Sequence, residues 1–221
     1  MKNQLVVSIL AAAVGDALSA AFIPGGNVAG VAISKVFAKR LEAAREIFLS
    51  ELATGEKNLN SAEFEESAAI VYRYLKAAQE GAARLNLRLL AAVFAGQVRE
   101  RTIVADEFLY YADLLSSLRR DEIILLGTLE RFAVEVRREQ IGFDNTDFAS
   151  RVSERARCAL IPAQFQDEEH YAAVAGALLR TGLVVGLSGW NTMVFIPSKL
   201  MAELNQLVEV EGVLQRDQAM Q

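Results

Sequence analysis

The chain has 221 residues, of which 52% are hydrophobic and 23% charged, and its formal net charge is −5. This balance describes a folded chain with a buried core, in one large or two small domains, and excludes collagen-like, proline-rich and disordered designs. The net negative charge argues against a general nucleic-acid binder. One cysteine, Cys158, permits neither an intrachain disulfide nor a thiolate metal cluster, which predicts a reducing, cytoplasmic location.

The chain begins with a long apolar stretch, residues 5–22, built mostly from small side chains. Asp16 is the only charged residue between Lys2 and Lys35. A secretory signal, a membrane span and a buried or half-buried helix are all open interpretations. Asp16 weighs against the first two, because a carboxylate interrupts a signal and costs roughly 2.5 to 3.5 kcal/mol at the centre of a span. We favour the buried helix, and membrane association remains an alternative.

Small residues recur at four-residue spacing, from Ala11 to Gly15 and again from Gly26 to Gly30. Such spacing lets two helical backbones approach closely, so we expect a tight helical hairpin. Its candidate interaction residues are Gly15, Asp16, Gly26 and Gly30. A phosphate cradle at the glycines is an alternative, but the dinucleotide and P-loop patterns are absent.

Apolar residues then recur every three or four positions, which is typical of amphipathic helices. We predict a helix within residues 26–52 and another after Asn60 and Glu63, which resemble a capping pair. Gly81 either bends the chain or starts the next helix, and residues 106–118 form a further one.

The helix after Gly81 carries arginines that could suggest a phosphate site. We interpret them instead as a solvated helix face paired with Glu80 and Glu100, because residues 61–141 hold 11 basic and 13 acidic side chains. The adjacent tyrosines of the following helix are also expected to be exposed. These expected surface residues are Arg84, Arg88, Arg99, Arg101, Tyr110 and Tyr111.

Strand signals appear only near the C-terminus, where two β-type runs are joined by a Ser-Gly-Trp-Asn turn. Helices precede and follow this predicted hairpin, which is the element order of a winged helix. The predicted elements are helices at 121–138 and about 152–160 with a surface loop at 141–150 between them, a helix at 167–181, strands at 183–187 and 192–196, and a helix from Ser198.

The predicted fold class is therefore mainly α: a helical bundle with an N-terminal apolar helical hairpin and a C-terminal winged-helix-like module that contains one β-hairpin. We assign residues 1–118 to the helical domain, 119–211 to the winged-helix-like module and 212–221 to a tail. Winged helices most often suggest DNA binding.

The charges of the C-terminal module argue against DNA. Its would-be recognition helix opens with Asp167, Glu168 and Glu169 and has a single basic residue, Arg180, near its end. Residues 142–221 hold six basic and ten acidic side chains, whereas DNA binding needs cations that neutralise phosphates. We therefore expect a module that packs against or contacts protein.

Signals for catalysis are weak. His170 is the only histidine, so a two-histidine metal site cannot be assembled. We expect Cys158 to be a small buried hydrophobe and His170 to be a first-turn helix residue among acids. The sequence predicts no enzyme, with no catalytic, cofactor-binding or metal residues. Trp190, at the predicted hairpin tip, is the remaining candidate interaction residue.

The order of features resembles the Abi-alpha-type abortive-infection proteins of bacteria and their helical relatives of unknown function. The resemblance spans nearly the whole chain, which departs from the family pattern at residues 5–22 and at Trp190. It implies a non-catalytic role in phage resistance, with no catalytic residues to carry over. The segments that carry it are GGNVAGVAISKVFAKRLEAAREIF, FLYYADLLSSLRRDEIILLGTL and LLRTGLVVGLSGWNTMVFIPSKLMAEL.

Together these observations predict a non-enzymatic interaction protein that forms a homo-oligomer and contacts an unknown protein partner. Two alternatives remain open. The apolar hairpin could make the chain a membrane-associating effector, or the C-terminal module could make it a winged-helix DNA-binding regulator.

Overall fold

The computed structural model describes residues 8–12, 14–15, 28–53, 63–100, 103–139, 145–188 and 193–219. The chain divides into two compact units, Met1–Ser117 and Leu118–Gln221. The fold is mainly helical, with one small antiparallel sheet of two strands in the second unit. The mainly α prediction is therefore confirmed, and no strand precedes residue 183 in the described ranges.

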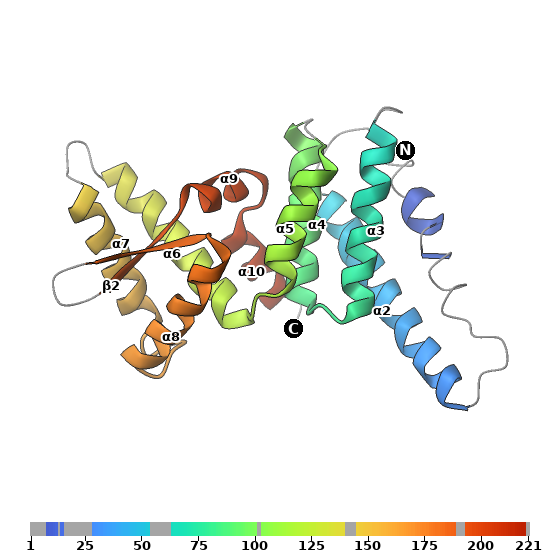
Figure 1. Cartoon of the computed structure of the whole chain (residues 1–221), viewed down its shortest axis with the longest axis horizontal. Coiled ribbons are helices and arrows are strands. Elements are labelled where there is room, and N and C mark those ends of the chain that lie inside the picture. The colour runs from blue at the N-terminus through green and yellow to red at the C-terminus, as the bar shows by residue number, and fades with distance from the viewer. Residues whose placement is uncertain are drawn as a thin grey trace. The chain divides into compact units, whose positions relative to one another are not determined.

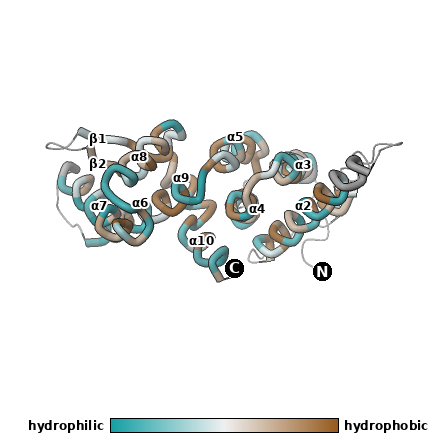
Figure 2. The backbone as a smooth tube through the Cα atoms, turned by 90° about the horizontal axis from the view of Figure 1, so that it is seen from below, coloured by the Kyte–Doolittle hydropathy of each residue, from teal (hydrophilic) through white to brown (hydrophobic). Residues whose placement is uncertain are grey.

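The first unit is a bundle of helices α2–α5. In Figure 1, α3, α4 and α5 run side by side and α2 crosses them obliquely. Hydrophobic and hydrophilic stretches alternate along α2, as amphipathic periodicity requires (Figure 2). The helices are α2 (Val28–Ala53), α3 (Phe64–Glu80), α4 (Arg84–Glu100) and α5 (Ala105–Ser116).

Helix α4 lies at the centre of this bundle and is buried from Leu85 to Val98. The aromatic core forms around Phe48, whose ring centroid is 4.8 Å from that of Tyr74 and 5.3 Å from that of Phe94. The buried Tyr74 hydroxyl donates a hydrogen bond to the Ala44 carbonyl at 2.8 Å. This hydrogen bond ties α3 to α2 within the core.

Two expectations for the first unit need correction. Arg88 is buried with 3% of its surface exposed, and it pairs with Glu51 at 3.0 Å instead of facing solvent. Tyr111 is also buried, whereas Tyr110 is 50% exposed. Both differences arise because α4 and α5 are each covered on more than one side. Helix α3 begins at Phe64, and Asn60 of the predicted capping pair lies outside the described residues.

In its described residues the second unit contains three helices, a hairpin and two short helices (Figure 1). Predicted helices around 167–181 and after Ser198, and the hairpin between them, are confirmed. The elements are α6 (Arg120–Glu139), α7 (Asn145–Leu160), α8 (Glu168–Leu178), the 3-10 turn η2 (Leu179–Thr181), β1 (Val184–Ser188), β2 (Met193–Pro197), α9 (Lys199–Leu207) and α10 (Val210–Gln218).

Local chemistry sets the ends of these elements. The Asp167 carboxylate accepts the His170 backbone N–H at 2.9 Å and caps α8. Ser198 caps α9 in the same way through the Met201 N–H at 3.2 Å. After η2 the chain reverses at Gly182, whose φ of 70° is in the left-handed region. The strands pair antiparallel, with Val184 opposite Pro197.

Two boundaries of the second unit differ from expectation. Residues 145–150, expected in a surface loop, form the start of α7, where Ala149 is 2% exposed. Residues from 212 onward, expected as a tail, continue up to Gln218 as α10, which packs on α6 with Val213 buried. A Cβ added at Gly127 of α6 would lie 3.1 Å from a Leu214 methyl, so this glycine permits the close approach of α10.

Candidate interaction surface of the second unit

The residues named from the N-terminal sequence are only partly described. Gly15 is exposed, and no described heavy atom lies within 4 Å of a Cβ added there. The close packing expected at Gly15 is therefore not seen in the residues that the structure describes. Gly30 lies in the first turn of α2. Asp16, Gly26 and Trp190 fall outside the described ranges.

The described part of the N-terminal stretch is helical and packed. Ile9, Leu10 and Val14 expose 8%, 0% and 7% of their surface. Across the described ranges, no helix is both long and apolar enough to cross a bilayer. These three apolar side chains are thus buried within the chain.

The exposed face of helix α8 consists mainly of small, uncharged residues. Its buried side is apolar, as the three- and four-residue spacing of Tyr171, Val174 and Leu178 predicts. Its exposed side carries no base and no bulky group beyond the first turn. That side consists of Ala172, Ala173, Gly176 and Ala177.

Larger apolar side chains continue this face onto the hairpin. A Cβ added at Gly186 would lie 3.0 Å from the Met193 sulfur and 3.6 Å from a Leu179 methyl, so both side chains cover this glycine. Met193 and Leu179 are 53% and 38% exposed. We call this set the α8–hairpin surface. It comprises Ala172, Ala173, Gly176, Ala177, Leu179 and Met193.

The other face of the hairpin is also aliphatic. Alternation along the strands places Val185 and Leu187 opposite Ile196 and Val194. Val185 and Leu187 are each 40% exposed. The hairpin therefore offers apolar side chains on both of its faces.

A pocket of about 540 Å³ lies between α7, α8 and β2 at the edge of this surface. Arg157 is its cation, and it is held by Glu154 at 2.6 Å and by Glu168. These hydrogen bonds raise the pKa of Arg157 and lower that of Glu154. With two carboxylates on one guanidinium, the pocket is not arranged to attract an anion.

Cys158 is exposed and not buried as predicted. Its thiol donates to the Glu154 carboxylate, with 3.4 Å between sulfur and oxygen. This hydrogen bond, and the charge of Glu154, raise the pKa of Cys158, which keeps the thiol protonated and weakly nucleophilic. Cys158 faces outward because the opposite side of α7, which carries Ala156 and Leu160, is buried.

Other chemistry-bearing groups near the pocket are isolated. Burial raises the pKa of Tyr171 to about 12, which keeps its hydroxyl protonated at neutral pH. His170 lies in the first turn of α8, as predicted, and is exposed, and its ring centroid is 5.2 Å from that of Phe165. Within the described residues, no group of three or more His, Cys, Asp or Glu side chains could hold a metal ion.

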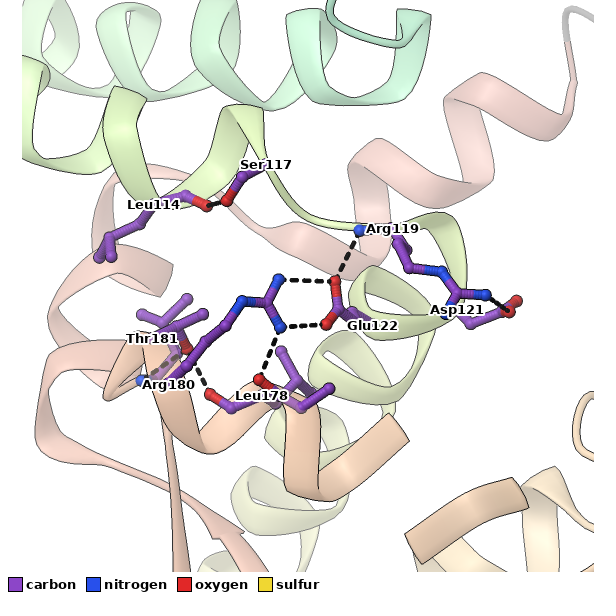
Figure 3. Close-up of polar contacts among 10 residues, drawn as sticks. Leu114, Ser117, Arg119, Asp121, Glu122, Leu178, Arg180 and Thr181 are labelled. Atoms are coloured by element: carbon purple, nitrogen blue, oxygen red, sulfur yellow. Dashed lines mark hydrogen bonds and ion pairs between the residues drawn. The ribbon is translucent and has the colours of Figure 1, made fainter. Parts of the chain in front are cut away.

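Arg180, the basic residue that follows α8, forms an ion pair with Glu122. Both Arg180 terminal nitrogens donate to the two oxygens of Glu122, which also accepts the Arg119 backbone N–H at 2.7 Å (Figure 3). Arg180 also donates to the Ala177 carbonyl at 2.6 Å. Glu122 is 2% exposed. The guanidinium is thus oriented toward the protein and not toward a ligand.

Sequence reasoning missed the residues that define this surface. Met193 belongs to a run with a clear strand pattern, and nothing in that pattern shows that its side chain is exposed. The sequence does carry one usable signal, the Ala-Ala-x-x-Gly-Ala spacing of α8, which predicts a smooth helix face.

No family model, curated protein or solved structure matches the chain.

Proposed function

We propose that the chain is a non-enzymatic interaction protein that self-associates and binds a protein partner through the α8–hairpin surface. The observation that carries this proposal is the exposed, uncharged apolar face formed by α8, Leu179 and Met193. Exposed apolar side chains that cluster in this way are typical of contact surfaces. The resemblance to abortive-infection proteins is the sole basis for proposing anti-phage defence in bacteria as the setting.

The element order α6, α7, α8, β1 and β2 supports a winged-helix-like module. In such modules the helix at the position of α8 reads DNA through basic and amide side chains. Here that helix exposes alanines and acids, and the nearby Arg180 is bound to Glu122. The module is therefore better suited to protein contacts than to DNA.

The DNA-binding alternative has a direct test. We expect the full chain to leave a fluorescent 30-base-pair duplex unbound at 50 mM salt, because cations are needed to displace counterions from phosphates. Fluorescence anisotropy measures this. A salt-dependent rise in anisotropy at micromolar protein would favour the regulator alternative instead.

The charges beside the α8–hairpin surface indicate what kind of protein partner would fit it. Asp167, Glu168 and Glu169 are exposed at the start of α8, beside the apolar face. A complementary protein surface would present apolar side chains next to basic ones. The proposed partner is therefore a protein segment of mixed apolar and basic character, on a second copy of this chain or on another protein.

The variant Ala173→Arg tests the self-association part. It introduces a long charged side chain at an exposed alanine in the middle of the α8–hairpin surface. We expect the wild-type chain to self-associate at micromolar concentration, and the variant to raise the dissociation constant at least about tenfold, equivalent to about 1.4 kcal/mol. Sedimentation velocity over a concentration series measures both constants.

The matched control is Ala69→Arg, the same change at an exposed alanine of α3. It should leave the dissociation constant of the wild-type chain unchanged. A wild-type monomer throughout the series, or equal constants for Ala173→Arg and wild type, would contradict the proposal.

A further inference from the structure

A second pocket of the C-terminal unit, of about 460 Å³, lies where α6 faces α9, α10 and the turn between them. It is separate from the pocket at α8. Gly127 and Val134 contribute apolar parts of its lining, and Asn205 contributes an amide. The remaining lining is charged: Glu130, Arg131, Glu135, Arg138, Glu209 and Glu211.

Acidic side chains outnumber basic ones in this lining. Arg131 is already paired with Glu211 at 3.0 Å. That pair leaves Glu130, Glu135 and Glu209 against the exposed Arg138. Within the lining itself acidic side chains therefore outnumber basic ones by four to two, and Arg137 and Arg216 lie close by.

Glu130 distinguishes this pocket from an ordinary acidic surface. It is 5% exposed, and its Oε2 atom has no hydrogen-bond partner. A buried carboxylate oxygen without a donor carries a desolvation cost that most proteins avoid. Burial raises the pKa of Glu130, and the charge of Arg137 offsets only part of this rise. Glu130 lines the pocket, so a rotation of its carboxyl group would offer an oxygen to a donor bound there.

We propose that this pocket binds an organic cation, with Glu130 accepting a hydrogen bond from its ammonium or guanidinium group. The apolar lining at Gly127 and Val134 suits an aliphatic stem, and the further carboxylates suit a second nitrogen. A metal ion fits less well, because no group of three acidic or histidine ligands converges within the described residues. The cation could be a free amine or a basic side chain of a peptide.

Calorimetric titration of the full chain tests this site with two probes. Agmatine represents the free amine, and an acetylated, amidated Ala-Arg-Ala peptide represents the side chain. We expect at least one of them to bind with a submillimolar dissociation constant at pH 7.5. Agmatine alone would identify a small-molecule site, the peptide alone a protein-contact site, and either result supports the proposal.

The variant Glu130→Gln should weaken that binding at least about tenfold. It keeps the side-chain shape and removes a buried charge, so its thermal unfolding temperature at neutral pH should not fall below that of the wild type. The matched control Glu65→Gln, at an exposed carboxylate of α3, should bind as the wild type does. Binding of neither probe, or equal affinity for wild type and Glu130→Gln, would overturn the proposal.

Proton linkage provides a readout that needs no variant. A bound cation favours ionised Glu130, so binding at pH 5.5 should release protons and should be weaker than at pH 7.5. Heats measured in two buffers of different ionisation enthalpy report this release, and its absence together with pH-independent affinity would count against Glu130. The other charged groups around the pocket include Arg131, Glu135, Arg137, Arg138, Arg155, Glu209, Glu211 and Arg216.

Discussion

Replacement of Arg88 by methionine is expected to lower the free energy of unfolding by about 3 to 5 kcal/mol, because it leaves the Glu51 carboxylate buried without its cation. The Arg88 and Glu51 side chains are each 3% exposed, and their charged atoms are 3.0 Å apart. Tyr74 lies in the same electrostatic environment, since both charges influence its pKa, which burial raises well above its usual range. Urea denaturation followed by circular dichroism measures the loss.

The double variant Glu51→Leu, Arg88→Met is the control for this prediction. With both charges removed, the core can pack without a charged group, so we expect most of the lost stability to return. A single variant as stable as the wild type would show that the ion pair is not needed. A double variant no more stable than the single one would show that packing, and not charge, explains the loss.

Replacement of Glu122 by alanine is the second large expected effect, a loss of about 2 to 3 kcal/mol at pH 7. This carboxylate is almost fully buried. It accepts hydrogen bonds from both Arg180 terminal nitrogens and from the Arg119 backbone N–H (Figure 3). The matched control is Glu139→Ala. Glu139 also binds an arginine in bidentate fashion, Arg155 at 2.9 and 2.7 Å, but its side chain is 49% exposed. Its loss should cost clearly less than the loss of Glu122, because solvent screens an exposed ion pair.

The contribution of Glu122 should depend on pH with a definite sign. Burial alone would raise its pKa, but hydrogen bonds from Arg180 and Arg119 reverse this and lower the pKa below its ordinary value in the folded state. Its stabilisation is therefore complete above the unfolded-state pKa of about 4.3 and is lost as the pH falls through the lower folded-state value. The difference between wild type and Glu122→Ala should shrink in that acidic window. A difference independent of pH down to pH 2, or equal losses for Glu122→Ala and Glu139→Ala, would contradict this account.

The helices and the hairpin could be predicted from the sequence because their signals are local. Apolar spacing of three or four residues identified α2 and α8, and the alternation on both sides of a Gly-containing turn identified β1 and β2. Gly182 marked the end of the helical run for the same local reason, since it adopts a left-handed conformation. Elements of this kind need little information about the rest of the chain.

Burial of single polar residues could not be predicted because it depends on which helices meet. Arg88 lies in a helix whose other arginines, Arg84 and Arg99, are exposed, yet its own position in α4 is covered and its partner Glu51 lies on another helix. Cys158 shows the converse, since an apolar residue type lies on an exposed face. Glu130 and Glu209, far apart in sequence, share a pocket only because α10 packs on α6. These relations are tertiary, and periodicity does not report them.

Hydrogen–deuterium exchange of the wild-type chain at low and high protein concentration tests the central claim most directly, because it locates the contact surface without a variant. We predict that amides of residues 168–178 and 193–197 exchange more slowly at the concentration where the chain self-associates, while amides of α3 do not change. Unchanged exchange in both segments upon self-association, with protection confined to other parts of the chain, would contradict it.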